Sequence, residues 1–398
     1  MDGQHQPSAA QAGREPVVRS ASVPCDARNA INALGDDLGQ GPFALVALFV
    51  APETDAQPLL DRASDVWPGA QIVGCTTAGE IALGVGYVEG SILAIGFPAA
   101  HFQADAILMQ DLESRDDQAL ISDVIRRRAQ LGQAAPTFDH EFAFLLVDGL
   151  SLQEDQLAST IVSGLGTMAM FGGSAGDGVR FEDTRVFHNG QTYTDAAVLT
   201  LLRTDCALRV FSLNHFEPSD QRMVVTGADP SRRIVHEINA EPAARELARL
   251  LGKAPEQIDT FTFAENPMVV RFGSQHHVRA IKRVTDDGDL EFFSAIDEGL
   301  VLTLAQSRPI AEHLRGALEA LSAPRPPDAI LACDCLLRRI EAEQKQLGRE
   351  VSQVLAEYKV SGFSTYGEQI GGMHVNQTMT GVALYAPDRT TDHARPSA

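Results

Sequence analysis

Two short segments far apart in the chain carry hydroxyl, glycine and glutamate residues in the same order. They are residues 74–80 (GCTTAGE) and 362–368 (GFSTYGE), which share the pattern G-x-[ST]-T-x-G-E. Residues 172–177 (GGSAGD) form a third, weaker turn of this kind. Glycine-rich turns after strands expose backbone N–H groups, which bind carboxylate or phosphate groups.

We therefore predict that the three turns line a small-ligand pocket, in which Glu80 and Glu368 bind an amine or orient the ligand. The predicted ligand-binding residues are Thr76, Thr77, Glu80, Ser174, Asp177, Ser364, Thr365 and Glu368. The alternative is structural: the glycines permit tight turns, the threonines satisfy the turn backbone, and the glutamates are surface acids. The sequence has neither a Walker motif nor GxGxxG, so nucleotide binding has no specific support.

Cysteine usage bears on both compartment and catalysis. The five cysteines are Cys25, Cys75, Cys206, Cys333 and Cys335. An odd number without paired spacing is unlike a secreted disulfide framework, so we expect a cytoplasmic protein. Cys75 or Cys333 would serve as the nucleophile of an enzyme if a basic partner lowered its thiol pKa. Free cysteines in reduced proteins are more often small core residues, so an enzyme is only an alternative.

Composition excludes other classes of function. The 398 residues include 53 acidic and 32 basic side chains, which gives a formal charge of −21. A polyanion is repelled by nucleic acid and by anionic membranes, so we expect neither as a partner. No stretch approaches the roughly 18 apolar residues of a membrane span. The ends, residues 1–16 and 387–398, have the composition of disordered tails.

The elements that must position the three turns follow one scheme. A strand over residues 43–50, a helix over 59–66 and a strand from 71 precede the first turn. A strand over 142–147 and a helix over 153–164 precede the weaker turn, and a strand over 329–333 and a long charged helix over 336–358 precede the last. Equivalent turns after equivalent strands predict an internally repeated scaffold.

This pattern predicts an α/β or mixed α+β fold of two fused, related halves, with mixed sheets flanked by helices. Residues 198–203, 208–213 and 223–225 are expected to be strands of one continuing sheet. We place the boundary near residue 228, between an N-terminal domain, 17–228, and a C-terminal domain, 229–386.

Several of these segments together carry a family resemblance. Residues 73–81 and 172–177 resemble the N-terminal half of the FIST sensory module. Residues 234–239, 362–368 and 374–378 resemble its C-terminal half, in the same order along the chain. The resemblance spans about residues 30–385 and implies a signal-input protein that binds a small ligand, without established catalytic residues.

Three further segments, residues 147–151, 295–300 and 373–378, are similar to the NosP type of FIST protein. That likeness implies a haem b cofactor, nitric oxide as the ligand and a histidine kinase as the partner. A haem iron requires one axial imidazole, and we predict His188 or His374 because each follows a glycine-rich turn. The alternative, a haem-free FIST module that binds an amino acid or similar metabolite, stays open.

Overall fold

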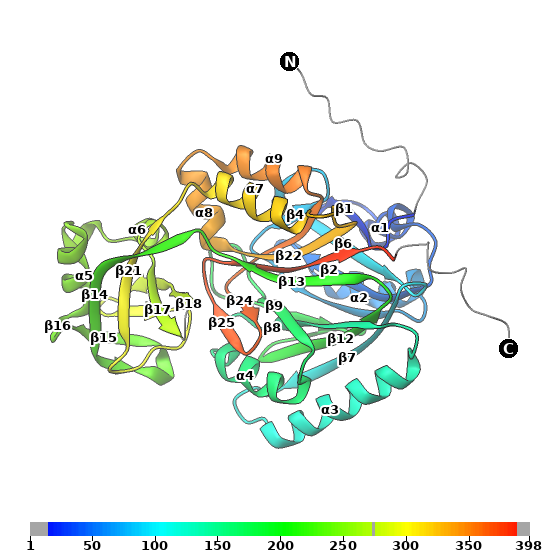
Figure 1. Ribbon diagram of the computed structural model, residues 1–398, viewed down its shortest axis with the longest axis horizontal. Helices are drawn as coiled ribbons and strands as arrows, with labels where there is room; N and C mark the ends of the chain where they lie inside the picture. Colours follow the sequence, from blue (N-terminus) through cyan, green and yellow to red (C-terminus); the bar gives the residue numbers. More distant parts are fainter. Residues whose placement is uncertain (1–14, 273–274, 388–398) are drawn as a thin grey trace, which may run out of the picture.

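The structure, a computed structural model, describes residues 15–272 and 275–387. The predicted tails lie almost entirely outside these residues. Helices and mixed sheets alternate along the chain, so the predicted mixed α+β class with helix-flanked sheets is confirmed. Most of the described chain forms a body of three units with the same order of elements, and a smaller lobe lies beside it (Figure 1).

Each unit runs strand, helix, strand, helix, strand, hairpin, strand. The first unit consists of β1 (Arg19–Pro24), α1 (Ala30–Leu38), β2 (Phe43–Val50), α2 (Gln57–Val66), β3 (Gln71–Thr76), β4 (Glu80–Ala82), β5 (Gly86–Val88) and β6 (Ser91–Pro98). The second consists of β7 (Phe102–Gln110), α3 (Asp117–Ala134), β8 (His140–Val147), α4 (Glu154–Leu165), β9 (Ala169–Ser174), β10 (Val186–His188), β11 (Gln191–Tyr193) and β12 (Ala196–Thr204).

The third unit repeats this order but receives the lobe as an insertion. It consists of β13 (Ala207–Leu213), α7 (Ile310–Leu321), β22 (Ala329–Cys335), α8 (Leu336–Gln344), α9 (Gly348–Glu357), β23 (Val360–Thr365), β24 (Glu368–Ile370), β25 (Met373–Val375) and β26 (Met379–Tyr385). The predicted single helix over 336–358 is wrong, because the chain breaks between α8 and α9, where Gln346 has a φ of 58°.

The three predicted strand-helix-strand units are confirmed, since β2 pairs with β3, β8 with β9 and β22 with β23 in parallel. The hairpin that follows each strand-helix-strand segment joins the sheet of another unit. β4–β5 extends the β22–β23 sheet, β10–β11 extends the β2–β3 sheet, and β24–β25 extends the β8–β9 sheet. This cyclic exchange brings the three turns that precede the hairpins to the centre of the body.

The buried strands explain how the units pack. On β2, Leu45, Ala47 and Phe49 belong to a central apolar core shared by all three units, whereas Val46 and Leu48 pack under the outer helices. A strand covered on both faces reads as the continuous apolar run seen in the sequence. The ring of Phe49 stacks on Phe363 of the third unit, with centroids 4.3 Å apart.

The lobe comprises β14 (Phe216–Asp229), β15 (Ile234–Ile238), β16 (Glu241–Pro242), α5 (Ala243–Leu251), α6 (Thr260–Glu265), β17 (Met268–Phe272), β18 (Gln275–Arg279), β19 (Ile281–Val284), β20 (Leu290–Phe292) and β21 (Val301–Ser307). Its two connections to the body lie side by side, because Phe216 pairs with Ser307. The predicted boundary near residue 228 falls within β14 and stays a prediction.

The expectation of one continuing sheet after residue 198 is wrong. β12, β13 and β14 are strands, as predicted, but each belongs to a different sheet. The short connections between them redirect the chain and do not form hairpins. Within residues 15–272 and 275–387, no helix combines the length and apolar character needed to cross a membrane.

Candidate functional site

The three turns are joined to one another by backbone hydrogen bonds. The Ser364 N–H donates to the Gly79 carbonyl (2.7 Å), and the Ser364 carbonyl accepts from the Ala78 N–H (2.9 Å). The Ser174 N–H donates to the Gly367 carbonyl (2.8 Å), which ties the second turn to the third. The prediction that the turns converge is therefore confirmed.

Glu80 is buried and serves its own turn. Its carboxylate accepts a hydrogen bond from the Thr77 hydroxyl (2.5 Å) and another from the Ser91 N–H at the start of β6 (3.2 Å). Burial raises the pKa of Glu80 from 4.5 to about 7, although both hydrogen bonds act to lower it. The glutamate thus links the turn to β6, and it is not the surface acid of the structural alternative.

Glu368 repeats this arrangement in the third unit. Its carboxylate accepts from the Thr365 hydroxyl and from the Thr378 N–H just before β26 (3.2 Å). Burial raises the pKa of Glu368 well above its ordinary value. In the second unit, Val186 occupies the position equivalent to Glu368. Glu368 pairs with Gly173 on β9, and Val186 pairs with Cys75, the matching residue on β3.

Asp177 is held differently, in a loop that only the second unit has at this place. Its carboxylate accepts from the N–H groups of Phe181 (2.8 Å), Glu182 and Asp183 (both 2.9 Å), and from the Tyr366 hydroxyl. Burial acts to raise the pKa of Asp177, but these hydrogen bonds outweigh it and the pKa is lowered. Asp177 is therefore an ionised, buried carboxylate at physiological pH.

A cavity of about 300 Å³ opens beside the first turn. It is lined by Ala51, Pro52, Glu53, Ala78, Gly79, Glu80, Glu89, Gly90, Asp177, Gly178, Val179, Arg180, Leu336, Arg339, Ile340 and Glu343. We call it the turn cavity. Its wall combines the first turn, the loop of the second unit and helix α8, so all three units contribute to it.

Both signs of charge face the turn cavity. Arg339 from α8 donates to Glu89 (2.8 Å) and to Glu343 (3.0 Å). The Arg180 Nε donates to the backbone carbonyl of Asp177 (3.1 Å), and its side chain is half exposed. The exposed acid Glu53 completes the rim and also lines a neighbouring cavity of about 480 Å³, as do Thr76 and Asp177.

Two family models match the chain: the FIST N domain over residues 44–241 and the FIST C domain over residues 243–371. The chain belongs to the FIST family. FIST domains are sensor domains of signal transduction, and small molecules are their ligands. A comparison with curated proteins gave no match. The two matched regions meet beside β16, within the lobe, so the division of the FIST sequence does not follow the three structural units.

Of the predicted ligand-binding residues of this FIST protein, the structure places Glu80 and Asp177 at the turn cavity and Thr76 and Asp177 at its neighbour. The others lie in the buried centre between the turns and line neither cavity; they are Thr77, Ser174, Ser364, Thr365 and Glu368. Their roles in ligand binding stay predictions.

His374, in β25, lies beside the same centre. Its Nδ1 accepts from the Gln369 amide (3.1 Å), which also donates to the Ser174 hydroxyl (3.0 Å). Nε2 has no partner among the described residues, and burial lowers the pKa of His374, so the imidazole is neutral. The imidazole ring packs closely against Gly367. A Cβ atom added to Gly367 would lie 2.2 Å from Cε1 of His374.

His188 lies apart, at the end of β10 in the sheet of the first unit, and is half-buried. Burial lowers its pKa. Neither histidine lines the turn cavity or its neighbour. A haem pocket requires apolar walls around the axial imidazole, but His374 is packed among Gln369, Asn376 and the Gly367 backbone.

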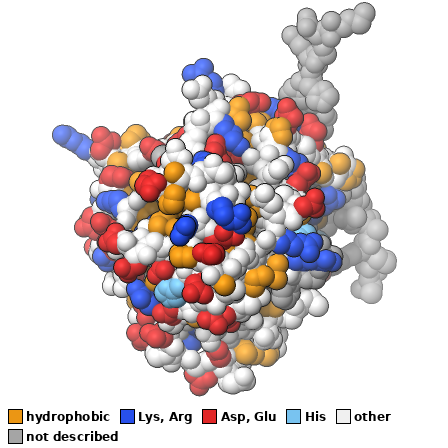
Figure 2. All heavy atoms as spheres, turned by 90° about the vertical axis from the view of Figure 1, so that its left-hand side faces the viewer, with side chains coloured by type: hydrophobic (Ala, Val, Ile, Leu, Met, Phe, Trp, Pro, Cys, Tyr) orange, Lys and Arg blue, Asp and Glu red, His pale blue; other side chains and the backbone are white. Residues whose placement is uncertain are grey.

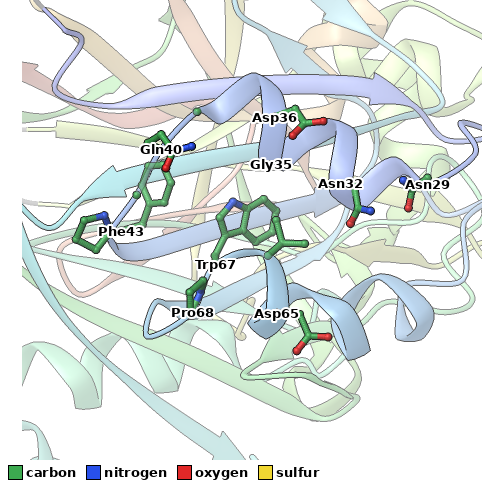
Figure 3. A pocket seen from close by; sticks show the side chains of 13 residues that line it. Asn29, Asn32, Gly35, Asp36, Gln40, Phe43, Asp65, Trp67 and Pro68 are labelled. Carbon is green, nitrogen blue, oxygen red and sulfur yellow. The ribbon is translucent and has the colours of Figure 1, made fainter.

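Two cavities of more than 700 Å³ lie elsewhere, and neither is lined by a histidine. One of about 770 Å³ is mainly apolar and lies between β1 and β22, with Val18, Ile95 and Leu331 in its walls. Another, of about 810 Å³, lies between α1 and α2 with Trp67 at its floor (Figure 3). No histidine is among the residues lining either one, so neither cavity offers an axial imidazole to a haem.

The cysteines proposed as nucleophiles are fully buried in the central core. Burial raises the pKa of the Cys75 and Cys333 thiols well above their ordinary values. A nucleophilic cysteine requires the opposite shift, so the enzyme alternative gains no support from these residues. Cys206, which is buried in the turn between β12 and β13, also has its pKa raised by burial, to about 12.

Sequence reasoning did not assign Tyr366 or Arg339 to the ligand site. Tyr366 joins the third turn to Asp177 and packs on Phe181, with ring centroids 4.5 Å apart. Arg339 follows a buried strand, and it lies over the Tyr87 ring at 5.3 Å. Tyr366 occupies the variable fifth position of the repeated pattern, so a repeat search ignores it. Comparison of the variable positions would have singled it out.

Proposed function

We propose that this FIST protein is a signal-input protein that binds a small zwitterion of the amino-acid type in the turn cavity. The observation that carries the proposal is the wall of that cavity, in which the exposed acid Glu53 and the buried, ionised Asp177 lie with the basic residues Arg180 and Arg339. An amino acid presents an ammonium group to the former and a carboxylate to the latter. A volume of about 300 Å³ suits a ligand of this size.

The walls of the turn cavity also contact the lobe, which gives binding a route to a partner. Phe181 follows Arg180 in the chain, and its ring lies 5.5 Å from that of Phe293 in the lobe. Leu337 of α8 packs in one apolar cluster with Val269 and Val278 of the lobe. A ligand that contacts residue 180 and α8 would therefore shift the population of lobe positions.

We infer from the NosP likeness that the partner is a histidine kinase and that both proteins act in the cytoplasm. The lobe offers a surface for such a partner. Figure 2 shows that this face of the molecule carries acidic and basic side chains interspersed with apolar ones. Mixed surfaces of this kind favour a specific partner with matching charges over general attraction to one sign of charge.

Thermal-shift screening followed by calorimetry with a panel of amino acids tests the proposal. A ligand of the folded state raises the unfolding midpoint by mass action. Loss of one charged contact costs about 1.5–3 kcal/mol, so Glu53→Gln and Arg180→Gln should each weaken binding about ten- to hundredfold. Both side chains are exposed at the rim, which leaves the fold intact. Glu113→Gln, at an exposed acid outside the cavity, is the matched control. Binding that none of the variants alters would contradict the proposed site.

Haem-based nitric oxide sensing is the second candidate, favoured by the neutral, unpartnered Nε2 of His374. Because the surroundings of His374 do not fit a haem, we expect no Soret band when the protein is purified from cells supplied with haem. A Soret band that nitric oxide shifts, and that His374→Ala or His188→Ala abolishes, would place this candidate ahead of amino-acid binding.

A further inference from the structure

A cluster of three different metal-ligating side chains lies away from the turn cavity. His101 is in the turn between β6 and β7, and Asp205 and Cys206 form the turn between β12 and β13. The two turns are adjacent because Phe102 pairs with Thr204 at the end of the β7–β12 ladder. Within residues 15–272 and 275–387, these residues form the one group of three or more histidine, cysteine, aspartate or glutamate side chains whose ligand atoms all lie within 4.8 Å of one another.

The distances within the cluster are close to those of a metal site. His101 Nδ1 lies 3.0 and 3.1 Å from the two Asp205 carboxylate oxygens, and Cys206 Sγ lies 3.5 Å from Oδ1. Ligands of a tetrahedral zinc ion, at about 2.0–2.3 Å from the metal, are roughly 3.3–3.8 Å from each other. Small side-chain adjustments therefore suffice to admit an ion.

The combination of donors selects the kind of ion. Imidazole nitrogen and thiolate sulfur are ligands of zinc and related transition metals, whereas magnesium and calcium require oxygen ligands. A hydrogen-bonded His101–Asp205 pair alone does not explain why the Cys206 thiol also lies against the same carboxylate. His101 also lines an open cavity of about 390 Å³, so an ion in solution has access to the histidine of the cluster.

We propose that His101, Asp205 and Cys206 form a binding site for one zinc-class divalent ion, with a water molecule as the fourth ligand. The ion forms a bond to Cys206 Sγ and the S–H proton passes to solvent, so the carboxylate and thiolate together balance the charge of the ion. The bound metal joins the turn between the first and second units to the turn between the second and third.

Cobalt(II) is the probe for this site, since it occupies zinc sites and is coloured when tetrahedral. Titration of the metal-free full chain should give visible d–d bands and a near-ultraviolet thiolate-to-cobalt charge-transfer band, both lost when zinc is added. Cys206→Ser should remove the charge-transfer band. Cys25→Ser is the matched control, because Cys25 is half-buried and distant from the cluster, and it should retain the band.

His101→Gln supplies a second test at a partly exposed side chain, in case Cys206→Ser does not fold. Loss of this ligand should weaken zinc binding, measured by competition with a chromophoric chelator, at least tenfold. A wild-type protein without the charge-transfer band would overturn the proposal. So would a band that persists in Cys206→Ser, or zinc affinity that His101→Gln leaves unchanged.

Discussion

Replacement of Glu80 by glutamine tests whether the repeated motif holds the fold with a protonated acid. In the folded protein burial raises the pKa of Glu80 from 4.5 to about 7. Below pH 4.5 the carboxyl is protonated in both the folded and the unfolded chain. As the pH rises from 4.5 to about 7, only the unfolded chain loses its proton, so the free energy of unfolding falls.

The magnitude follows from the interval between the two pKa values. It corresponds to about 3 kcal/mol, of which about 2 kcal/mol falls between pH 5.5 and 8. Measurements should start at pH 5.5 because the isoelectric point is about 4.8. Glutamine does not ionise, so Glu80→Gln lacks this loss. The free energy of unfolding of the variant should therefore gain about 2 kcal/mol on the wild type as the pH rises to 8.

Urea unfolding followed by circular dichroism at a series of pH values measures this difference. Other titrating groups, including Glu368 and the buried histidines, contribute equally to the free energy of unfolding of the variant and of the wild type. Their contributions cancel when one free energy is subtracted from the other at each pH. Glu113→Gln, at an exposed acid, is the matched control. If the wild type instead gains on Glu80→Gln with rising pH, or the difference stays flat, Glu80 is ionised in the folded state and the reasoning is refuted.

Three further predictions concern stability. Gly362→Ala should destabilise the fold by about 3 kcal/mol or more, because the new Cβ would lie 1.8 Å from the Ala332 carbonyl oxygen. Gly316→Ala lies in open space on α7 and should stabilise the fold by about 0.5–1 kcal/mol. Thermal unfolding of the two variants measures both effects. Arg338→Met should cost about 3–5 kcal/mol in urea unfolding, since it leaves the buried Asp334 carboxylate without its 2.7 Å ion pair; a cost below 1 kcal/mol would show that the pair is dispensable. Burial and neighbouring cations lower the pKa of His313 from 6.5 to about 4, so the wild type should lose stability as the pH falls through this range, and His313→Gln should lose less.

The repeated motif was the most informative part of the sequence, and its meaning is largely structural. Gly74, Gly172 and Gly362 occupy the same place in the three units. At each, an added Cβ would lie 1.8–2.2 Å from a carbonyl oxygen of the neighbouring parallel strand. The need for glycine at this place is local, so it is visible in a single sequence.

The cyclic exchange of hairpins depends on contacts that a single sequence does not show. β4, β10 and β24 each have three residues, and their pairing partners are remote along the chain. The second unit also lacks the glutamate, with Val186 in its place, so the pattern pointed to two copies and only weakly to a third. The lobe interrupts the third unit and hides its similarity to the others.

Two insertions into the threefold repeat indicate where function resides. In the first and third units the turn closes directly onto its hairpin, and its threonine and glutamate hydrogen-bond to each other. The second unit instead inserts the loop around Asp177, and the third inserts the lobe after β13. The two insertions touch, since Phe181 of the loop packs on Phe293 of the lobe.

Neither insertion is needed to complete a sheet of the body, because all three body sheets are built from repeated strands. What the insertions add is the wall of the turn cavity and a contact between that wall and the lobe. A symmetric scaffold presents equivalent turns, but a sensor requires one binding site and one output. We therefore expect substitutions at Arg180 and Phe181 to alter ligand response with little loss of stability, whereas substitutions at Thr77 and Thr365 should alter stability first. For each substitution, the change in the free energy of ligand binding is divided by the change in the free energy of unfolding. This ratio should be larger for Arg180 and Phe181 than for Thr77 and Thr365. Equal ratios would contradict the assignment of function to the insertions.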